Sequence, residues 1–218
     1  MHKPSLAALY NESRAFYLGT SLSEGHYPLL SEAPAKGPLN LEVDLADRTK
    51  KTNTDYYPYP IIKDSINLDD GLVFVSEPFQ KEMILNGSFT GELLMESNKK
   101  DFDFSVNLYE LTPEGQYVYL SFYIGRAGYA KSREQRELLT PNKTTKITFD
   151  NTRISSKKIS KNSRIVVVIN GNKNAFGQVN YGSGKDVSTE SINDAQSPLE
   201  IKIQRGSRVV LPLWGTEQ

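Results

Sequence analysis

The chain has 218 residues, of which 38% are hydrophobic and 24% charged, a composition typical of a folded globular protein. Its 26 lysines and arginines balance 26 aspartates and glutamates, which argues against nucleic acid or an anionic membrane as a partner. There is no cysteine, so disulfide bonds, thiolate zinc sites and a cysteine nucleophile are excluded.

Residues 1–70 are expected to form an irregular arm or linker that enters the main domain. They contain six prolines, and their apolar stretches at Ala15–Leu18 and Leu39–Val43 are brief. An arm of this length is usually functional, a linker, or part of a larger assembly. No apolar stretch follows Met1, so no signal peptide is predicted and a soluble chain is expected.

Three tyrosines near the end of the arm, Tyr56, Tyr57 and Tyr59, lie among prolines. Aromatic rings in such a segment have three interpretations. They could stack on a sugar, contact another domain, or simply pack the loop on the core. The sequence leaves all three open.

Residues 71–218 are expected to form an all-β domain, because short apolar runs alternate with turn residues and a helical period is lacking. Many short, irregularly spaced strands favour a sandwich or jelly roll. The longest apolar run, Ile165–Ile169, is far shorter than the roughly 20 residues of a membrane helix. The expected strands are Leu72–Val75, Met83–Glu92, Phe102–Leu111, Gln116–Ile124, Thr144–Phe149, Ile165–Ile169, Leu199–Ile203 and Arg208–Leu211.

One hairpin can be predicted with its register. The sequence Thr112-Pro113-Glu114-Gly115 suits a type I turn followed by a glycine with positive φ, which pairs Thr112 with Gln116. Every apolar residue of the inner face then meets another apolar residue. The predicted pairs are Leu108 with Leu120, Val106 with Phe122, and Phe104 with Ile124. The other face, with Asp103, Ser105 and Asn107, is expected to meet water or a partner.

The same register places Arg126 opposite Phe102 on the apolar face, near the end of the strand. A buried guanidinium needs carboxylate or carbonyl partners, so we expect Arg126 to anchor the edge of the sheet. Arg164, just before Ile165–Ile169, has a similar but weaker indication of a structural role.

No catalytic residue, metal ligand or cofactor is predicted. The only histidines are His2 and His26, and a nucleophile elbow with the pattern G-x-S-x-G is absent. The glycine-rich segment Asn180–Asp186 lacks phosphate-loop spacing and is expected to be a flexible connection. The alternating acids of Asp101-Phe102-Asp103 lack the other ligands of a calcium loop and are expected on a solvated strand face.

Seven segments in order resemble the C-terminal domain of the CocE/NonD hydrolases, which include cocaine esterase, glutaryl acylases and X-prolyl dipeptidyl-peptidases. The segments are Gly71–Phe79, Leu85–Gly91, Lys100–Phe104, Leu111–Gly115, Gly125–Tyr129, Ser163–Val168 and Leu211–Leu213. Arg14–Leu18 is similar to the segment by which such enzymes leave the hydrolase domain. Where the family usually has serine and arginine after Arg126, this chain has Gly128 and Ala130, and Ser163 replaces the usual Gly-His.

The resemblance implies a galactose-binding-like jelly-roll β-sandwich packed on an α/β-hydrolase catalytic domain of the same parent chain, which would carry the Ser-Asp-His triad. The chain would then be an accessory domain of an X-Pro dipeptidyl-peptidase, esterase or acylase. A free-standing carbohydrate-binding module that uses the three tyrosines is the alternative. Without its partner, the chain is expected to expose apolar surface through which it could self-associate.

Overall fold

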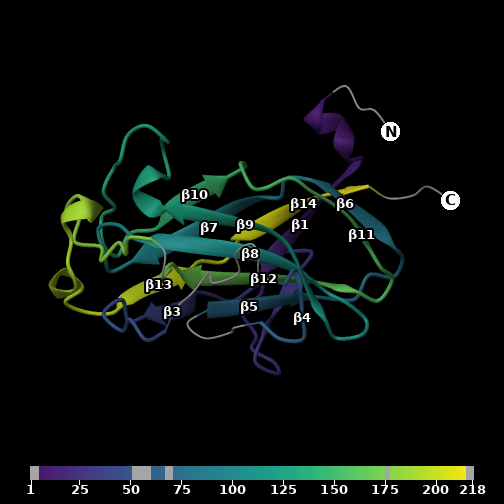
Figure 1. Ribbon diagram of the computed structural model, residues 1–218, viewed down its shortest axis with the longest axis horizontal. Coiled ribbons are helices and arrows are strands. Elements are labelled where there is room, and N and C mark those ends of the chain that lie inside the picture. The colour runs from purple at the N-terminus through teal and green to yellow at the C-terminus, as the bar shows by residue number, and fades with distance from the viewer. Residues whose placement is uncertain (1–4, 51–59, 67–70, 175–176, 215–218) are drawn as a thin grey trace.

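The computed structural model describes residues 5–50, 60–66, 71–174 and 177–214, and folds them into a two-layered β-sandwich (Figure 1). The predicted all-β sandwich is confirmed, whereas its galactose-binding-like type stays a prediction. Within the described ranges, no helix is long and apolar enough to cross a membrane. The strands are β1 Glu12–Leu18, β2 Tyr27–Leu30, β3 Leu39–Val43, β4 Ile62–Lys63, β5 Gly71–Ser76, β6 Met83–Gly87, β7 Thr90–Ser97, β8 Asp103–Leu111, β9 Tyr117–Arg126, β10 Thr145–Phe149, β11 Ser155–Ile159, β12 Arg164–Gly171, β13 Leu199–Ile203 and β14 Arg208–Trp214.

One layer is built around β14, which pairs antiparallel with β1 on one side and with β6 and β7 on the other. β7 also pairs with β10 and with β13. β13 pairs in addition with β3, and β6 pairs with β11. The second layer has the order β2-β5-β12-β8-β9-β4. In this layer β2 and β5 are parallel, and the other pairs are antiparallel.

The two layers are joined where β1 meets β2. β1 runs beside β14 from Glu12 to Tyr17, and only its last residues, Tyr17 and Leu18, pair with β2. β2 then continues the hydrogen bonding into β5. The segment expected as an irregular arm therefore contains strands of both layers, and β3 pairs with β13 along its whole length. The proposed boundary at residue 70 stays a prediction.

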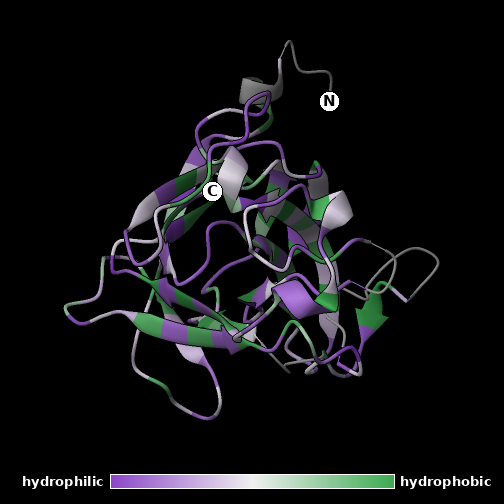
Figure 2. Cartoon of the chain, turned by 90° about the vertical axis from the view of Figure 1, so that its left-hand side faces the viewer, coloured by the Kyte–Doolittle hydropathy of each residue, from purple (hydrophilic) through white to green (hydrophobic). Residues whose placement is uncertain are grey.

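The core fills the space between the layers. Side chains from both layers form one buried cluster, which includes Phe74 and Phe104 from one layer and Leu93 and Leu211 from the other. Alternation explains this arrangement, because every second residue of a strand points to the same face. Figure 2 shows hydrophobic and hydrophilic residues alternating in bands along several strands. A smaller cluster, Val73, Tyr109, Val166 and Val168, lies apart from it on the second layer.

The described residues include four short 3-10 turns, which lie at opposite ends of the sandwich. η2 (Ala127–Tyr129), η3 (Val187–Thr189) and η4 (Ile192–Asp194) gather at the left in Figure 1, within the long connections that follow β9 and β12. η1 (Leu6–Leu9) lies at the other end, beside β6, where the Asn86 side-chain amide donates to the Leu9 carbonyl at 2.6 Å. We call these the loop end and the η1 end.

The predicted hairpin register is correct beside the turn and wrong beyond it. Thr112 donates to the Gln116 carbonyl at 2.8 Å, and Leu111 faces Tyr117 as expected. A β-bulge between Leu108 and Tyr109 then shifts the pairing by one residue. The observed pairs are Leu108 with Ser121, Val106 with Tyr123, Phe104 with Gly125 and Asp103 with Arg126.

The physical reason for the shift is aromatic packing. The bulge turns the Tyr123 ring inward, where it stacks on Phe149 with ring centroids 4.4 Å apart and also contacts Phe104. Ile124, predicted to face the core, is 39% exposed instead. A second difference is that Met83–Glu92 is two strands, since Gly87 has a φ of 139° and the ladder breaks after it.

Gly91 provides a test of this packing. It lies opposite Phe149, whose Cζ would be only 2.2 Å from a Cβ at this position. We expect Gly91→Ala to lower the free energy of unfolding by about 1–3 kcal/mol, since the ring must move. Urea unfolding measures this loss. Gly177→Ala is the matched control, because a Cβ there meets nothing within 4 Å; equal stability losses for the two variants would contradict the packing.

Candidate functional site

Arg126 lies at the loop end, paired with an acid on the neighbouring strand. Its guanidinium makes two hydrogen bonds to Asp103, at 2.7 and 2.9 Å, and Asn180 donates to the same carboxylate at 3.0 Å. The Asp103 hydrogen bond raises the pKa of Arg126. The prediction that Arg126 opposes Phe102 is wrong, because the bulge brings Asp103 opposite it. Its role as an anchor of the sheet stays a prediction.

Asp101 is fully buried, so the expected solvated strand face is wrong. Its carboxylate accepts hydrogen bonds from the backbone N–H groups of Phe102 and Gly128 and from Arg136. Arg136 also donates to the Lys185 carbonyl at 2.6 Å. Arg136 therefore ties Asp101 and the connection after β9 to the connection after β12. Both charges of this pair, Asp101 and Arg136, thus have partners within the chain.

The glycine-rich segment is also held by hydrogen bonds, and is not the flexible connection that the sequence favoured. Glu190 accepts from the backbone N–H groups of Tyr181 and Ser183 at 2.8 and 2.9 Å. Further along, Asp194 accepts from the Ser191 N–H in a capping box and pairs with Lys185. This connection is thereby fixed as a structured loop.

Lys99 fastens the far side of the same connection. Its ammonium group donates to the carbonyls of Ala195 and Ser197 at 2.6 and 2.7 Å, and burial lowers its pKa. Carbonyl oxygens satisfy the donors of a buried ammonium group, which explains why the lysine lies inside.

Arg164 lies towards the other end of the sandwich. Its guanidinium donates to the Ser76 carbonyl at 2.8 Å, and the Ser76 hydroxyl accepts from the Ile165 N–H. Next to it, the buried Glu110 accepts from Ser163 at 2.7 Å and pairs with Lys157. These contacts join β5, β8, β11 and β12, which agrees with a structural role; that role itself stays a prediction.

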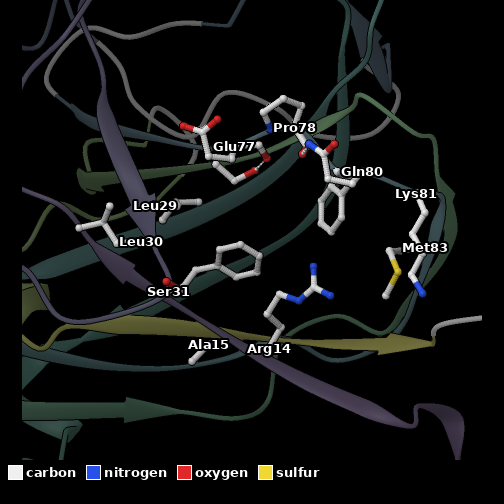
Figure 3. A pocket seen from close by; sticks show the side chains of 13 residues that line it. Arg14, Ala15, Leu29, Leu30, Ser31, Glu77, Pro78, Gln80, Lys81 and Met83 are labelled. Atoms are coloured by element: carbon white, nitrogen blue, oxygen red, sulfur yellow. Dashed lines mark hydrogen bonds between the residues drawn. The ribbon is translucent and has the colours of Figure 1, made fainter.

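The η1 end has an open groove of about 670 Å³ between β1, β2 and the connection from β5 to β6. Figure 3 shows Leu29 and Leu30 on one side, Glu77 and Pro78 across from Arg14, and the Arg14 guanidinium directed into the space. The floor is apolar and buried, formed by Phe16, Leu29, Phe79 and Met83. We call this feature the seam groove, because it opens where the two layers separate.

Arg14 stands at the mouth of the seam groove. Its Cζ lies 5.4 Å from the centroid of the Phe79 ring, a cation–π distance, and its Nε and Nη2 both contact Oε1 of Glu12. Sequence reasoning noticed Arg14–Leu18 only as part of a family resemblance. It missed the groove, because Phe16, Leu29 and Phe79 are far apart in the sequence and no local pattern joins them.

Two further site predictions stay predictions. Tyr56, Tyr57 and Tyr59 lie outside the described residues, so their three interpretations stay predictions. In the part of the chain that the structure describes, no group of three or more histidine, cysteine or acidic residues is placed to hold a metal ion.

The decisive comparison is with protein families. Residues 5–202 match the family described as the X-Pro dipeptidyl-peptidase C-terminal non-catalytic domain. This chain belongs to that family. It is therefore a non-catalytic C-terminal domain, and the resemblance seen in its motifs is confirmed.

Solved structures support the same fold. An α-amino acid ester hydrolase matches with a TM-score of 0.75 at 19% identity, covering 92% of this chain and 36% of that chain. An aminopeptidase from a marine sediment archaeon of the Thaumarchaeota matches with a TM-score of 0.74 at 16% identity, covering 94% of this chain and 37% of the aminopeptidase. A CocE/NonD family hydrolase from Staphylococcus aureus has a TM-score of 0.63 at 13% identity, covering 97% of this chain and 38% of that hydrolase.

This family member thus spans little more than a third of the length of those hydrolases. A search of curated proteins gives no match. At such low identities, the likeness to the solved structures concerns the fold.

We expect Arg126→Met to lower the free energy of unfolding by about 1–3 kcal/mol, because it leaves the mostly buried Asp103 carboxylate without its charged partner. Arg133→Met is the matched control: Arg133 makes a 2.7 Å ion pair with Asp150, but both side chains are at least two-thirds exposed. Urea unfolding compares the two. If Arg126→Met unfolds with the same free energy as the unsubstituted chain, Arg126 does not anchor the sheet.

The capping box predicts a pH dependence. The hydrogen bond from Lys185, followed by that from the Ser191 N–H, holds the pKa of Asp194 below its ordinary value of 3.8. Its contribution to stability is therefore complete above that value and is lost as the pH falls through the lowered pKa. The NMR shift of the Ser191 amide is expected to change with pH with a midpoint below pH 3.8. The Asp194→Asn variant is expected to lack this change. A midpoint at or above 3.8 would contradict the capping contact.

Proposed function

We propose that this chain packs on an α/β-hydrolase catalytic domain of the same parent chain, stabilises it and helps to shape its substrate cleft. The parent enzyme would be a serine hydrolase of the X-Pro dipeptidyl-peptidase, esterase or acylase type. The observation that carries the proposal is the match to a non-catalytic C-terminal domain over residues 5–202.

The distribution of polar contacts supports this role. At the loop end, Asp101, Asp103 and Glu190 each have several partners within the chain, so these loops are held together by internal hydrogen bonds. A rigid sandwich is a suitable support for another domain, since its surface keeps its shape on docking.

A free-standing carbohydrate-binding module was the alternative function. It depends on Tyr56, Tyr57 and Tyr59, which lie outside the described residues, so no described contact supports it. Titration calorimetry against a panel of sugars remains the direct measurement.

The first test needs only the gene. The coding sequence that precedes residue 1 is expected to encode a hydrolase segment with a G-x-S-x-G elbow. In addition, the 218-residue chain is expected to hydrolyse neither esters nor X-Pro peptides above the buffer rate. A true start codon with no hydrolase segment before it would refute the proposal.

Coupling between the domains gives a second measurement. Gly91→Ala, placed in the parent enzyme, is expected to lower the temperature at which hydrolase activity is lost, because the catalytic domain loses a stable support. Gly177→Ala is the control and is expected to leave that temperature unchanged. Identical inactivation of both variants and the unsubstituted enzyme would show that the chain does not stabilise the catalytic domain.

A further inference from the structure

The walls of the seam groove are fixed by backbone hydrogen bonds. On one side, β1 pairs with β14 from Glu12 to Tyr17. On the other, Phe79 donates to the Ser163 carbonyl at 2.9 Å and accepts from the Asn162 N–H at 2.8 Å. A pocket whose walls are held in this way exists before anything binds, which is typical of binding sites.

The groove is open for a topological reason. β1 stays with β14 in one layer, whereas β2 passes to β5 in the other, so the strands diverge from Tyr17 back towards Arg14. The buried floor of Phe16, Leu29, Phe79 and Met83 is left beneath a mouth where Arg14, Leu30 and Lys81 reach the surface. An apolar side chain placed on this floor would leave water at a gain of about 25 cal/mol per Å² of buried apolar surface.

Arg14 can bind one more acceptor at this mouth. Both of its contacts with Glu12 use a single oxygen, Oε1, so one edge of the guanidinium is occupied. A guanidinium has five N–H donors arranged as a fork, and the remaining edge can bind a carboxylate or a carbonyl. The cation–π contact with Phe79 keeps the guanidinium beside the groove.

We propose, on the basis of the function proposed above, that the seam groove receives a segment of the hydrolase's catalytic domain, which inserts an apolar side chain and offers an acceptor to Arg14. Two observations select this occupant. The family is a C-terminal domain, so a catalytic part would precede it in sequence, and the first described residues, with η1, lie at the end of the sandwich where the groove opens. The matched hydrolases also have nearly two thirds of their length outside this domain, which is ample chain to cover the groove.

The absence of cysteine from the chain allows a specific test. Single cysteines are introduced by Leu30→Cys and Gln80→Cys at the groove, and by Glu134→Cys at the loop end as a control. Each variant is made both in the 218-residue chain and in the parent enzyme. The rate of maleimide labelling at each site is followed by peptide mass spectrometry, so that other cysteines of the parent do not interfere.

Labelling of the two groove thiols is expected to be about tenfold slower or more in the parent than in the 218-residue chain, because a covered thiol reacts only when the interface opens. Labelling of Glu134→Cys is expected to be equal in both. If the two groove thiols are labelled at the same rate in both proteins while the loop-end thiol is protected in the parent, the seam groove is not the docking site, although the domain still docks. Equal rates at all three positions would refute the groove and count against docking.

A second pair of variants tests the apolar character of the occupant. Leu30→Asp is expected to lower the melting temperature of the parent more than that of the 218-residue chain, since the charge would face the inserted side chain. Leu22→Asp changes an exposed leucine outside the groove and serves as the control. If Leu30→Asp lowers both melting temperatures equally, an apolar occupant is ruled out. Self-association of the 218-residue chain with protection of the groove thiols would instead identify a second copy as the occupant and overturn the proposal.

Discussion

The structure depends on one constraint: β1 must belong to one layer along most of its length and pass the chain to the other layer at its end. β1 pairs with six residues of β14 and then gives only Tyr17 and Leu18 to β2. This transfer sets the position of β5 through β2, and with it the second layer that closes over the core. The seam groove is the geometric result of the same divergence.

Sequence patterns predicted the elements whose signal is local. Most strands from residue 71 onward and the turn at Thr112–Gln116 follow from alternation and turn chemistry, and the structure contains them. The strand Ser155–Ile159 was not predicted, and Met83–Glu92 is two strands instead of one. Arg126 was also recognised as a residue in need of carboxylate or carbonyl partners, although Asp103 was not identified as the partner. The motif resemblance identified the family, which the comparison then established.

The errors arose where distant residues decide the local structure. The inward turn of Tyr123 depends on Phe149, a strand away, and no turn rule contains that contact. Asp101 is acidic and next to a strand, so it looked solvated. Its burial is compensated by Arg136, 35 positions further on, and by the Gly128 N–H, and neither partner is evident from the local sequence. The strands of residues 1–70 are short and interrupted by proline, and their pairing with β14, β5 and β13 has no local signal.

The placement of β1, β2 and β3 has a consequence for handling the protein. A shortened chain that began at residue 71 would lack all three, and would leave β14, β5 and β13 each with an unpaired edge. Bare strand edges recruit other strands, so such a fragment would tend to form intermolecular sheets. The proline-rich stretch thus protects the fold from aggregation, a task quite separate from any contact with an enzyme.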